Sequence, residues 1–340
     1  MEYLRNEFDR DLNEEGSVVI AQNSFLRDQI LRGLDYTAYE EAFVEWCGQQ
    51  HSQKCERADE ILSLFDNEGR FFKLKEIFAR GAVTPFVGAG LSMPSGYPGW
   101  TKFLTNLVSE TRIDKTEFAE MISNGQYEES AEMLAADLPE GSFLEQVENA
   151  FGISRQISGC IQKLPHLFKS AVITTNFDTL LERIYQDSEA CDGFEEILLA
   201  GDAIDLPKTL GSGKRALVKL HGDASKSRYR VLTKSEYDRH YGTDGTLEAV
   251  IEAISNQTLL FMGCSLSVDR TLSNLTSIVR RKGIENIPKH YAFLKLDEPE
   301  KRLERRDQLA ACNIHPIWYT DDHDECLEAL LEKLGAGVCL

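Results

Sequence analysis

From residue 84 onward, short continuous apolar runs recur along the chain, and each is followed by small or polar residues and then by a helical pattern. Several runs lack polar alternation, which is typical of strands that are buried on both faces. Alternation of strand and helix patterns predicts an α/β fold with a doubly wound, Rossmann-like parallel sheet. The predicted strands are 84–87, 171–174, 217–220, 259–262, 291–296 and 314–318.

The first part of the chain has a different pattern, because it is acidic and its apolar side chains, such as Phe43 and Trp46, recur at helical spacing. We expect residues 1–75 to form a helical extension that serves assembly or partner contact. The alternative is a helical cap packed on the chain's own core. Residues 76–340 form the expected Rossmann-like domain, and a helical module inserted at about 101–168 should leave a cleft beside the sheet.

Composition narrows the function classes. The formal charge of −19 over 340 residues repels a phosphate backbone, and the basic clusters at 280–282 and 301–306 are short, so we predict no direct nucleic-acid binding. The chain has no apolar run long enough for a membrane span and no secretory signal pattern, which favours a cytoplasmic protein without membrane contact. The eight cysteines include no Cys-x-x-Cys pair, so neither a metal site nor a disulfide framework is expected.

The clearest local motif is a buried strand that runs directly into the segment Gly88-Ala89-Gly90-Leu91-Ser92. Glycines allow a tight turn and close approach to a pyrophosphate, whose charge is then met by backbone N–H groups. The third glycine of a full dinucleotide fingerprint is missing, since Met93 stands in its place. The motif alone therefore also fits a tight turn that binds no ligand.

Three further polar or glycine-rich segments follow later predicted strands: 174–178 (TTNFD), 220–223 (LHGD) and 263–266 (GCSL). Open α/β sheets bind their ligands at the carboxyl ends of the strands. The four segments should therefore converge on one crevice.

The segments GAGLSMPSGYPGW, TTNFD, KLHGD and GCSL, in this order, resemble the signature segments of the sirtuin superfamily over roughly residues 80–320. Within it the chain is most similar to the SIR2-like, NAD-hydrolysing proteins of bacterial antiphage defence, which often carry Trp where deacetylating sirtuins carry Phe-Arg; Gly99-Trp100 occupies that place. Deacetylating sirtuins also carry four cysteines between the His-Gly and Gly-x-Ser segments. Residues 223–262 contain none, so the resemblance implies no zinc ribbon.

The resemblance implies that NAD is the substrate and assigns roles to single residues. Asn176 would hold the nicotinamide-side ribose and the attacking water, Asp178 would bind the nicotinamide carboxamide, and His221 would be the general base. The other expected NAD-binding residues belong to the two glycine-rich segments, and the first four would contact the pyrophosphate: Gly88, Ala89, Gly90, Ser92, Gly263 and Ser265.

Each assignment has a structural alternative. Asn176 and Ser265 could cap the helices that follow them, and Asp178 could interact with a helix dipole. His221 could close a turn. Asp269 could be an acid at a helix start or a ribose contact.

The leading hypothesis is an NAD glycohydrolase that releases nicotinamide and ADP-ribose and depletes NAD in an infected cell. The alternatives are a sensor or scaffold that binds NAD or ADP-ribose without turnover, and a sirtuin-type deacylase or ADP-ribosyltransferase. Since constant hydrolysis would kill the host cell, we expect the chain to be held inactive by homo-oligomeric assembly or by a protein partner, such as a HerA-type ATPase.

Overall fold

The computed structural model describes residues 2–139, 141–226, 228–242, 246–267 and 270–338. Its contacts divide the chain into two compact units, Met1–Glu60 and Ile61–Leu340. Composition placed the boundary near residue 75, whereas α4 (Asn67–Phe78) belongs to the second unit because it packs on strands of the sheet. The expected role of residues 1–75 in assembly stays a prediction.

The first unit is a small helical unit with a β-hairpin. Its elements are α1 (Arg5–Glu14), β1 (Val18–Ile20), β2 (Asn23–Phe25), α2 (Arg27–Leu34) and α3 (Tyr36–Leu62). Phe8 of α1 packs on α3, with its ring centroid 5.3 Å from that of Tyr39 and 5.5 Å from that of Phe43. The hydroxyl of Tyr39 donates to Asp9 at 2.7 Å, which ties the same two helices by a polar contact.

The second unit is built on a seven-stranded parallel sheet with the order β5-β6-β4-β3-β7-β8-β9. Without β5, this order becomes 3-2-1-4-5-6 along the chain, which is the order of dinucleotide-binding Rossmann folds. The α/β prediction is therefore confirmed. The strands are β3 (Val83–Val87), β4 (Ala171–Thr174), β5 (Glu196–Leu199), β6 (Ala216–Lys219), β7 (Thr258–Met262), β8 (His290–Lys295) and β9 (Ile314–Tyr319).

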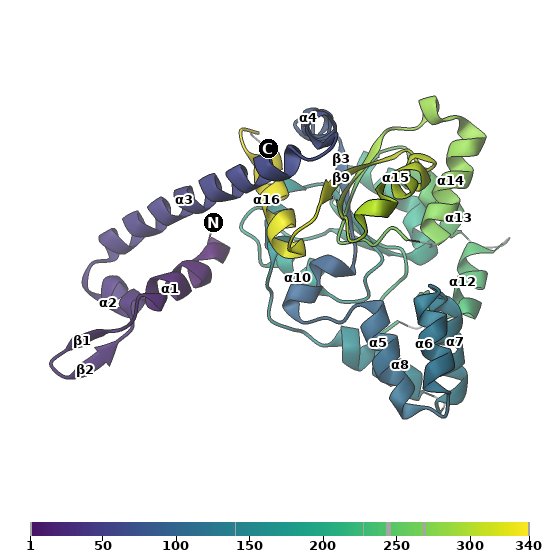
Figure 1. The fold of residues 1–340 in the computed structure, drawn as a ribbon, viewed down its shortest axis with the longest axis horizontal. Coiled ribbons are helices and arrows are strands. Elements are labelled where there is room, and N and C mark those ends of the chain that lie inside the picture. Colours follow the sequence, from purple (N-terminus) through teal and green to yellow (C-terminus); the bar gives the residue numbers. More distant parts are fainter. Residues whose placement is uncertain (1, 140, 227, 243–245, 268–269, 339–340) are drawn as a thin grey trace. The chain divides into compact units, whose positions relative to one another are not determined.

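Helices cover both faces of this sheet (Figure 1). Side chains such as Phe86, Phe261 and Leu294 point to one face and pack against α13, α14 and α15. On the opposite face Phe293 of β8 stacks on Phe71 of α4 at 6.3 Å. The helices outside the inserted module are α9 (Leu164–Leu167), α10 (Leu180–Gln186), α11 (Leu206–Gly211), α12 (Lys234–Tyr241), α13 (Leu247–Ile254), α14 (Arg270–Lys282), α15 (Arg302–Ala310) and α16 (His323–Gly335).

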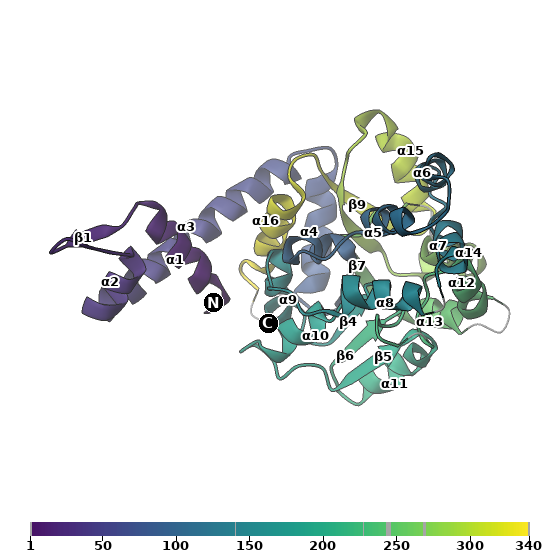
Figure 2. The same ribbon diagram turned by 90° about the horizontal axis from the view of Figure 1, so that it is seen from below.

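A helical module lies between β3 and β4 in the chain, as the apolar spacing indicated. Its helices are α5 (Trp100–Leu107), α6 (Lys115–Ser123), α7 (Tyr127–Asp137) and α8 (Ser142–Val147), and they share a core of their own. Figure 2 shows α7 beside α12 and α14, which come from the other end of the unit's sequence. Phe177, Ala224 and Leu232 also enter the module's core, so segments that follow β4 and β6 are packed against it.

Candidate active site at the carboxyl edge of the sheet

Strands β3, β4, β6 and β7 are neighbours, so the four segments singled out in the sequence begin at one edge of the sheet. Thr174 at the end of β4 joins two of them, since its hydroxyl donates to the carbonyl of Val87 at 2.7 Å and accepts from the backbone N–H of Asn176 at 3.0 Å. The end of β4 therefore fixes the direction in which residues 175–178 leave the sheet.

The glycines of these segments allow two loops to pack backbone against backbone. A Cβ atom on Gly88 would lie 2.4 Å from the carbonyl oxygen of Gly263, and one on Gly263 would lie 2.7 Å from the nitrogen of Leu91. Gly263 also has a φ of +66°, a conformation that glycine adopts without strain. The N–H of Gly90 donates to Gly263 at 2.9 Å. The pyrophosphate role of Gly88, Ala89, Gly90 and Ser92 and the NAD-binding role of Gly263 stay predictions, and loop packing is an independent reason for Gly88 and Gly263.

Ser92, Asn176 and Asp178 form a buried polar cluster, with side chains exposed by 1%, 7% and 5%. The Asn176 amide donates to the hydroxyl of Ser92 at 3.1 Å, and the N-cap residue of the following helix is Thr179. Asp178 accepts the backbone N–H of Leu180 at 3.0 Å, which is the helix-start contact that its structural alternative requires. Burial raises the pKa of the Asp178 carboxyl, and hydrogen bonds from Leu180 and Ser92 oppose that rise.

The side chain between Asn176 and Asp178 anchors the cluster to the helical module. The ring of Phe177 lies edge-on to Trp100 at 5.0 Å and packs 6.0 Å from Phe151. Trp100 is the residue by which the chain departs from the deacetylase pattern. Its contact with Phe177 means that the module and the Asn176 segment share one packed interior.

Lys219, the last residue of β6, is a fully buried cation beneath the same segment. Its ammonium group donates to the carbonyl of Asp178 at 2.8 Å and pairs with Glu182 at 2.8 Å and Asp223 at 3.0 Å. A buried charge is tolerated when its partners satisfy it in this way. Lys219 stands in the KLHGD segment, but sequence reasoning assigned it no role.

His221 lies two residues beyond β6 and is covered by two tyrosines of α12. Its Nε2 atom lies 2.9 Å from the hydroxyl of Tyr241, and its Nδ1 atom lies 3.5 Å from that of Tyr237. Burial lowers the pKa of His221 to about 3, so its imidazole is neutral at physiological pH. Neither tyrosine could be found from sequence reasoning, since each lies sixteen or more residues from His221 and belongs to no motif.

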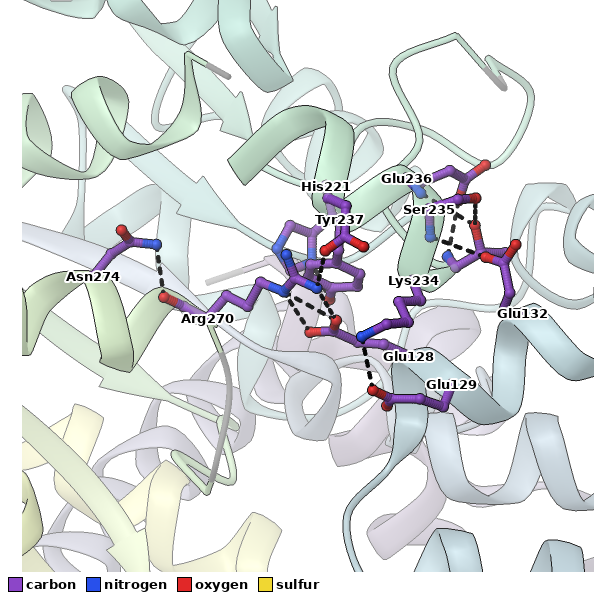
Figure 3. Close-up of polar contacts among 12 residues, drawn as sticks. Glu128, Glu129, Glu132, His221, Lys234, Ser235, Glu236, Tyr237, Arg270 and Asn274 are labelled. Carbon is purple, nitrogen blue, oxygen red and sulfur yellow. Dashed lines mark hydrogen bonds and ion pairs between the residues drawn. The ribbon is translucent and has the colours of Figure 1, made fainter. Parts of the chain in front are cut away.

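An arginine ties α12 and the inserted module to the helix after β7. Arg270 at the start of α14 binds both carboxylate oxygens of Glu128 on α7, at 2.5–3.0 Å, and pairs with Asp238 on α12 at 2.7 Å. Its guanidinium also lies 5.2 Å from the ring centroid of Tyr237. Arg270, Glu128 and Asp238 are named here the Arg270 clamp. Figure 3 shows Arg270 and Glu128, with Tyr237 and His221 beside them.

Two nearby contacts also join α7 to α12. The ammonium of Lys234 pairs with Glu129 at 3.1 Å, and the N–H of Ser235 donates to Glu132 at 2.9 Å (Figure 3). The two acids lie on α7 and their partners begin α12. The cover over His221 is therefore held to the inserted module through the first half of α7.

The predicted residues beyond β7 are placed differently from the cluster. Ser265 is exposed, and its hydroxyl lies 3.0 Å from that of Ser267. It makes no side-chain contact to Asn176 or His221 among the described residues. Asp269 lies outside the described residues.

His323, to which the sequence analysis assigned no role in the site, lies beside the first glycine-rich segment. Its Nε2 atom is 2.6 Å from where a Cβ atom on Gly90 would stand, and it is buried without a hydrogen-bond partner among the described residues. The other ring nitrogen, Nδ1, lies 2.6 Å from the hydroxyl of Tyr319. No sequence spacing connects His323 with Gly90, because β9 and the start of α16 bring it there.

A cavity of about 560 Å³ adjoins the segment after Ser92. Met93, Tyr97, Pro98, Asn149 and Arg155 are among its lining residues. Burial and the charge of Asp178 both raise the pKa of Tyr97, which places this ring close to the buried cluster. The volume is within the range of small-molecule sites, roughly 300–1,000 Å³.

Metal binding and membrane insertion are functions other than nucleotide binding that such a chain could have. Among the described residues, no group of three or more His, Cys, Asp or Glu side chains is arranged to hold a metal ion. In the same part of the chain, no helix combines the length and the apolar character needed to cross a membrane.

Comparison with known proteins agrees with this arrangement of strands and loops. Residues 170–317, which hold the Asn176, His221 and Gly263 segments, match the family model of the SIR2-like domain. The matched residues run from β4 into β9, and they include Asn176 and Asp178 of the buried cluster but not Ser92.

Three relatives show the same likeness at modest identity. The chain is 23% identical to an NAD(+) hydrolase ThsA of Enterococcus faecium, over 69% of this chain and 48% of the relative. It is 28% identical to an NAD(+) hydrolase ThsA of Acinetobacter baumannii, over 62% of this chain and 42% of the relative. A defense-associated sirtuin 2 of Bacillus subtilis is 24% identical, over 71% of this chain and 24% of the relative. This chain thus spans less than half the length of the three relatives.

Proposed function

We propose that the chain hydrolyses NAD to nicotinamide and ADP-ribose at the carboxyl edge of its sheet. The observation that carries the proposal is the buried cluster of Ser92, Asn176 and Asp178 at the edge of a sheet with the Rossmann strand order. The neutral imidazole of His221 follows the adjoining strand, β6. Relatives whose names describe NAD hydrolysis support the same reaction.

In the proposed reaction, the oxygen of a water molecule bonds to C1′ of the nicotinamide ribose while the bond from C1′ to the ring nitrogen breaks. The nitrogen keeps the electron pair, so nicotinamide leaves as a neutral molecule and needs no acid. Asn176 would hold the ribose and the water, and Asp178 would bind the carboxamide. His221 would accept the proton that the water releases.

His221 is a weak base while it is buried, because a pKa of about 3 leaves little tendency to take a proton. Its Nε2 atom is also occupied by Tyr241. Turnover would therefore require α12 to move and water to enter, which would raise the pKa of His221. This closed arrangement supports our proposal that the chain is held inactive until assembly with further copies or with a protein partner opens it.

The biological proposal is depletion of NAD in an infected bacterial cell. The defence-associated name of one relative supports it. A partner such as a HerA-type ATPase would then be the trigger, and a homo-oligomer the assembled form.

The decisive experiment follows free nicotinamide after the purified full chain is incubated with NAD, alone and with an acetylated peptide. We expect release that does not require the peptide, in the assembled form in which α12 no longer covers His221. Asn176→Ala and His221→Ala should each reduce it about a hundred- to ten-thousand-fold, the usual effect of losing a positioned catalytic group. The matched controls, Asn124→Ala and His51→Ala, replace exposed residues of the same types.

The outcomes separate the three hypotheses. Peptide-dependent release would favour a deacylase, and heat protection by NAD without release, under conditions that open the site, would favour a sensor. Release that survives in both site variants within about threefold would refute the assignment of Asn176 and His221.

A further inference from the structure

A second cavity, of about 300 Å³, lies far along the strands from the candidate active site. It is formed by α4 and by the amino ends of β8 and β9, whereas Ser92, Asn176 and His221 follow the carboxyl ends of β3, β4 and β6. Its lining residues are Asp66, Gly69, Arg70, Lys73, Lys289, Tyr291 and His315. Because all strands are parallel, the two sites are at opposite edges of one sheet.

The lining is basic, although the chain as a whole carries a formal charge of −19. Lys73 and Lys289 make no hydrogen bond or ion pair with any described residue. The one carboxylate in the lining, Asp66, pairs with Arg70 at 3.5 Å and is itself 80% exposed. Neither lysine therefore has an ion-pair partner among the described residues.

The floor of the cavity is rigid and polar. Arg70 is held in place because its guanidinium donates to the carbonyl of Pro316 at 2.6 Å. The ring of Tyr291 is buried and lies 6.0 Å from that of His315. These side chains come from α4, β8 and β9, so the cations are gathered by the fold and not by a run of basic sequence.

The positive charges around the cavity repel one another, and this lowers the pKa of two lining residues. Burial and the positive charges of Lys289, Arg70 and Lys73 lower the pKa of His315 to about 4. Burial lowers the pKa of Arg70, and the charges of Arg302 and Arg306 on α15 contribute. An anion in the cavity would relieve this repulsion, whereas a neutral ligand would not.

We propose that this cavity is a binding site for a small phosphate-bearing ligand, with Lys73, Lys289 and Arg70 as the groups that contact the phosphate. Lysine binds phosphate as a point charge and arginine through its fork of N–H donors. The volume is at the lower limit for ligand pockets, so the site fits a phosphate or pyrophosphate group better than a whole dinucleotide.

Calorimetric titration of the full chain with sodium pyrophosphate at low salt tests the proposal. We expect binding of one pyrophosphate that weakens as salt is added. Lys73→Gln/Lys289→Gln should weaken it by about tenfold or more, because both ammonium groups that would contact the phosphate are removed. Lys115→Gln/Lys208→Gln is the matched control, because it removes the same charge from exposed lysines on α6 and α11.

Each remaining outcome is decisive. Absence of pyrophosphate binding, or equal weakening in the two double variants, would overturn the proposal. Binding of a twelve-nucleotide single strand that depends on Lys73 and Lys289, without binding of pyrophosphate, would also overturn it and indicate a nucleic-acid contact instead. Lys73→Gln and Lys289→Gln are also made singly. Their melting temperatures, compared with that of the wild type, show whether any loss of pyrophosphate binding comes from unfolding.

Discussion

The Nε2 atom of His221 lies 2.9 Å from the hydroxyl oxygen of Tyr241, where His221 is buried and Tyr241 is partly buried. This contact joins the residue after β6 to α12, twenty positions along the chain. The second tyrosine, Tyr237, reaches the other ring nitrogen only at 3.5 Å, the outer limit of a hydrogen bond. The two tyrosines should therefore contribute unequally to the folded state.

Tyr241→Phe should lower the free energy of unfolding by about 1–3 kcal/mol, because it leaves a buried ring nitrogen without its partner. Tyr237→Phe, its matched control on the same helix, should lower the free energy of unfolding by less than half as much. Urea unfolding of the full chain measures the free energy of unfolding of both variants. Equal losses would mean that the Tyr241 contact does not hold α12 in place.

Removal of the Arg270 clamp should loosen α7 and α12. Arg270 is 25% exposed and joins three helices, so Arg270→Ala should speed amide exchange in α7 and α12 by several-fold or more. Arg281→Ala is the control, because Arg281 is on the same helix but is 54% exposed and pairs at the surface with Glu252. Faster exchange in the control, or unchanged exchange with Arg270→Ala, would contradict the clamp.

Gly88→Ala should lower the free energy of unfolding of the second unit by about 1–3 kcal/mol, since its new methyl group would press on the carbonyl of Gly263 at 2.4 Å. Gly211→Ala at the end of α11 is the comparison, because a Cβ atom there meets nothing within 4 Å. It should be neutral or slightly stabilising. Denaturant unfolding of the two variants would refute the loop-packing account if their midpoints shifted alike.

His290 makes stability depend on pH. Its Nδ1 atom accepts the N–H of Leu259 at 3.2 Å, and burial lowers its pKa from 6.5 to about 4. Above pH 6.5 both folded and unfolded chains carry a neutral His290. Between pH 6.5 and 4 only the unfolded chain binds the proton, so stability falls as the pH falls, by roughly 3 kcal/mol at most from this residue.

The measurement compares unfolding free energies at pH 7.5, 6 and 5 for the wild type, His290→Gln and His51→Gln. We expect a shallower decline with acid for His290→Gln than for the wild type. His51→Gln changes an exposed residue and should follow the wild-type curve. Parallel curves for all three proteins would show that His290 does not cause the decline.

The six predicted strands were found because each is a continuous buried run, and β3, β4 and β7 have no exposed position. The edge strand β5 was missed. It has exposed and half-exposed positions, so its apolar pattern is weak. Its neighbour β6 covers only one of its edges.

The sequence likewise predicts some parts of the candidate site and not others. Ser92, Asn176 and Asp178 could be grouped in advance because each follows a strand, and parallel strands end at a common edge. The Arg270 contact with Glu128 could not, since 142 positions separate the two residues and neither belongs to a motif. Such contacts depend on how the inserted helices pack, which apolar spacing does not specify.

The mutual hydrogen bonding of Ser92, Asn176 and Asp178 has a thermodynamic consequence. A ligand that takes the place of one of these partners exchanges one hydrogen bond for another, so its net gain from that bond is small. The side chains are already ordered by packing, so little rotamer entropy is lost on binding. At this cluster, the strength of binding therefore depends on the apolar surface that a ligand buries, while the three polar side chains determine its orientation.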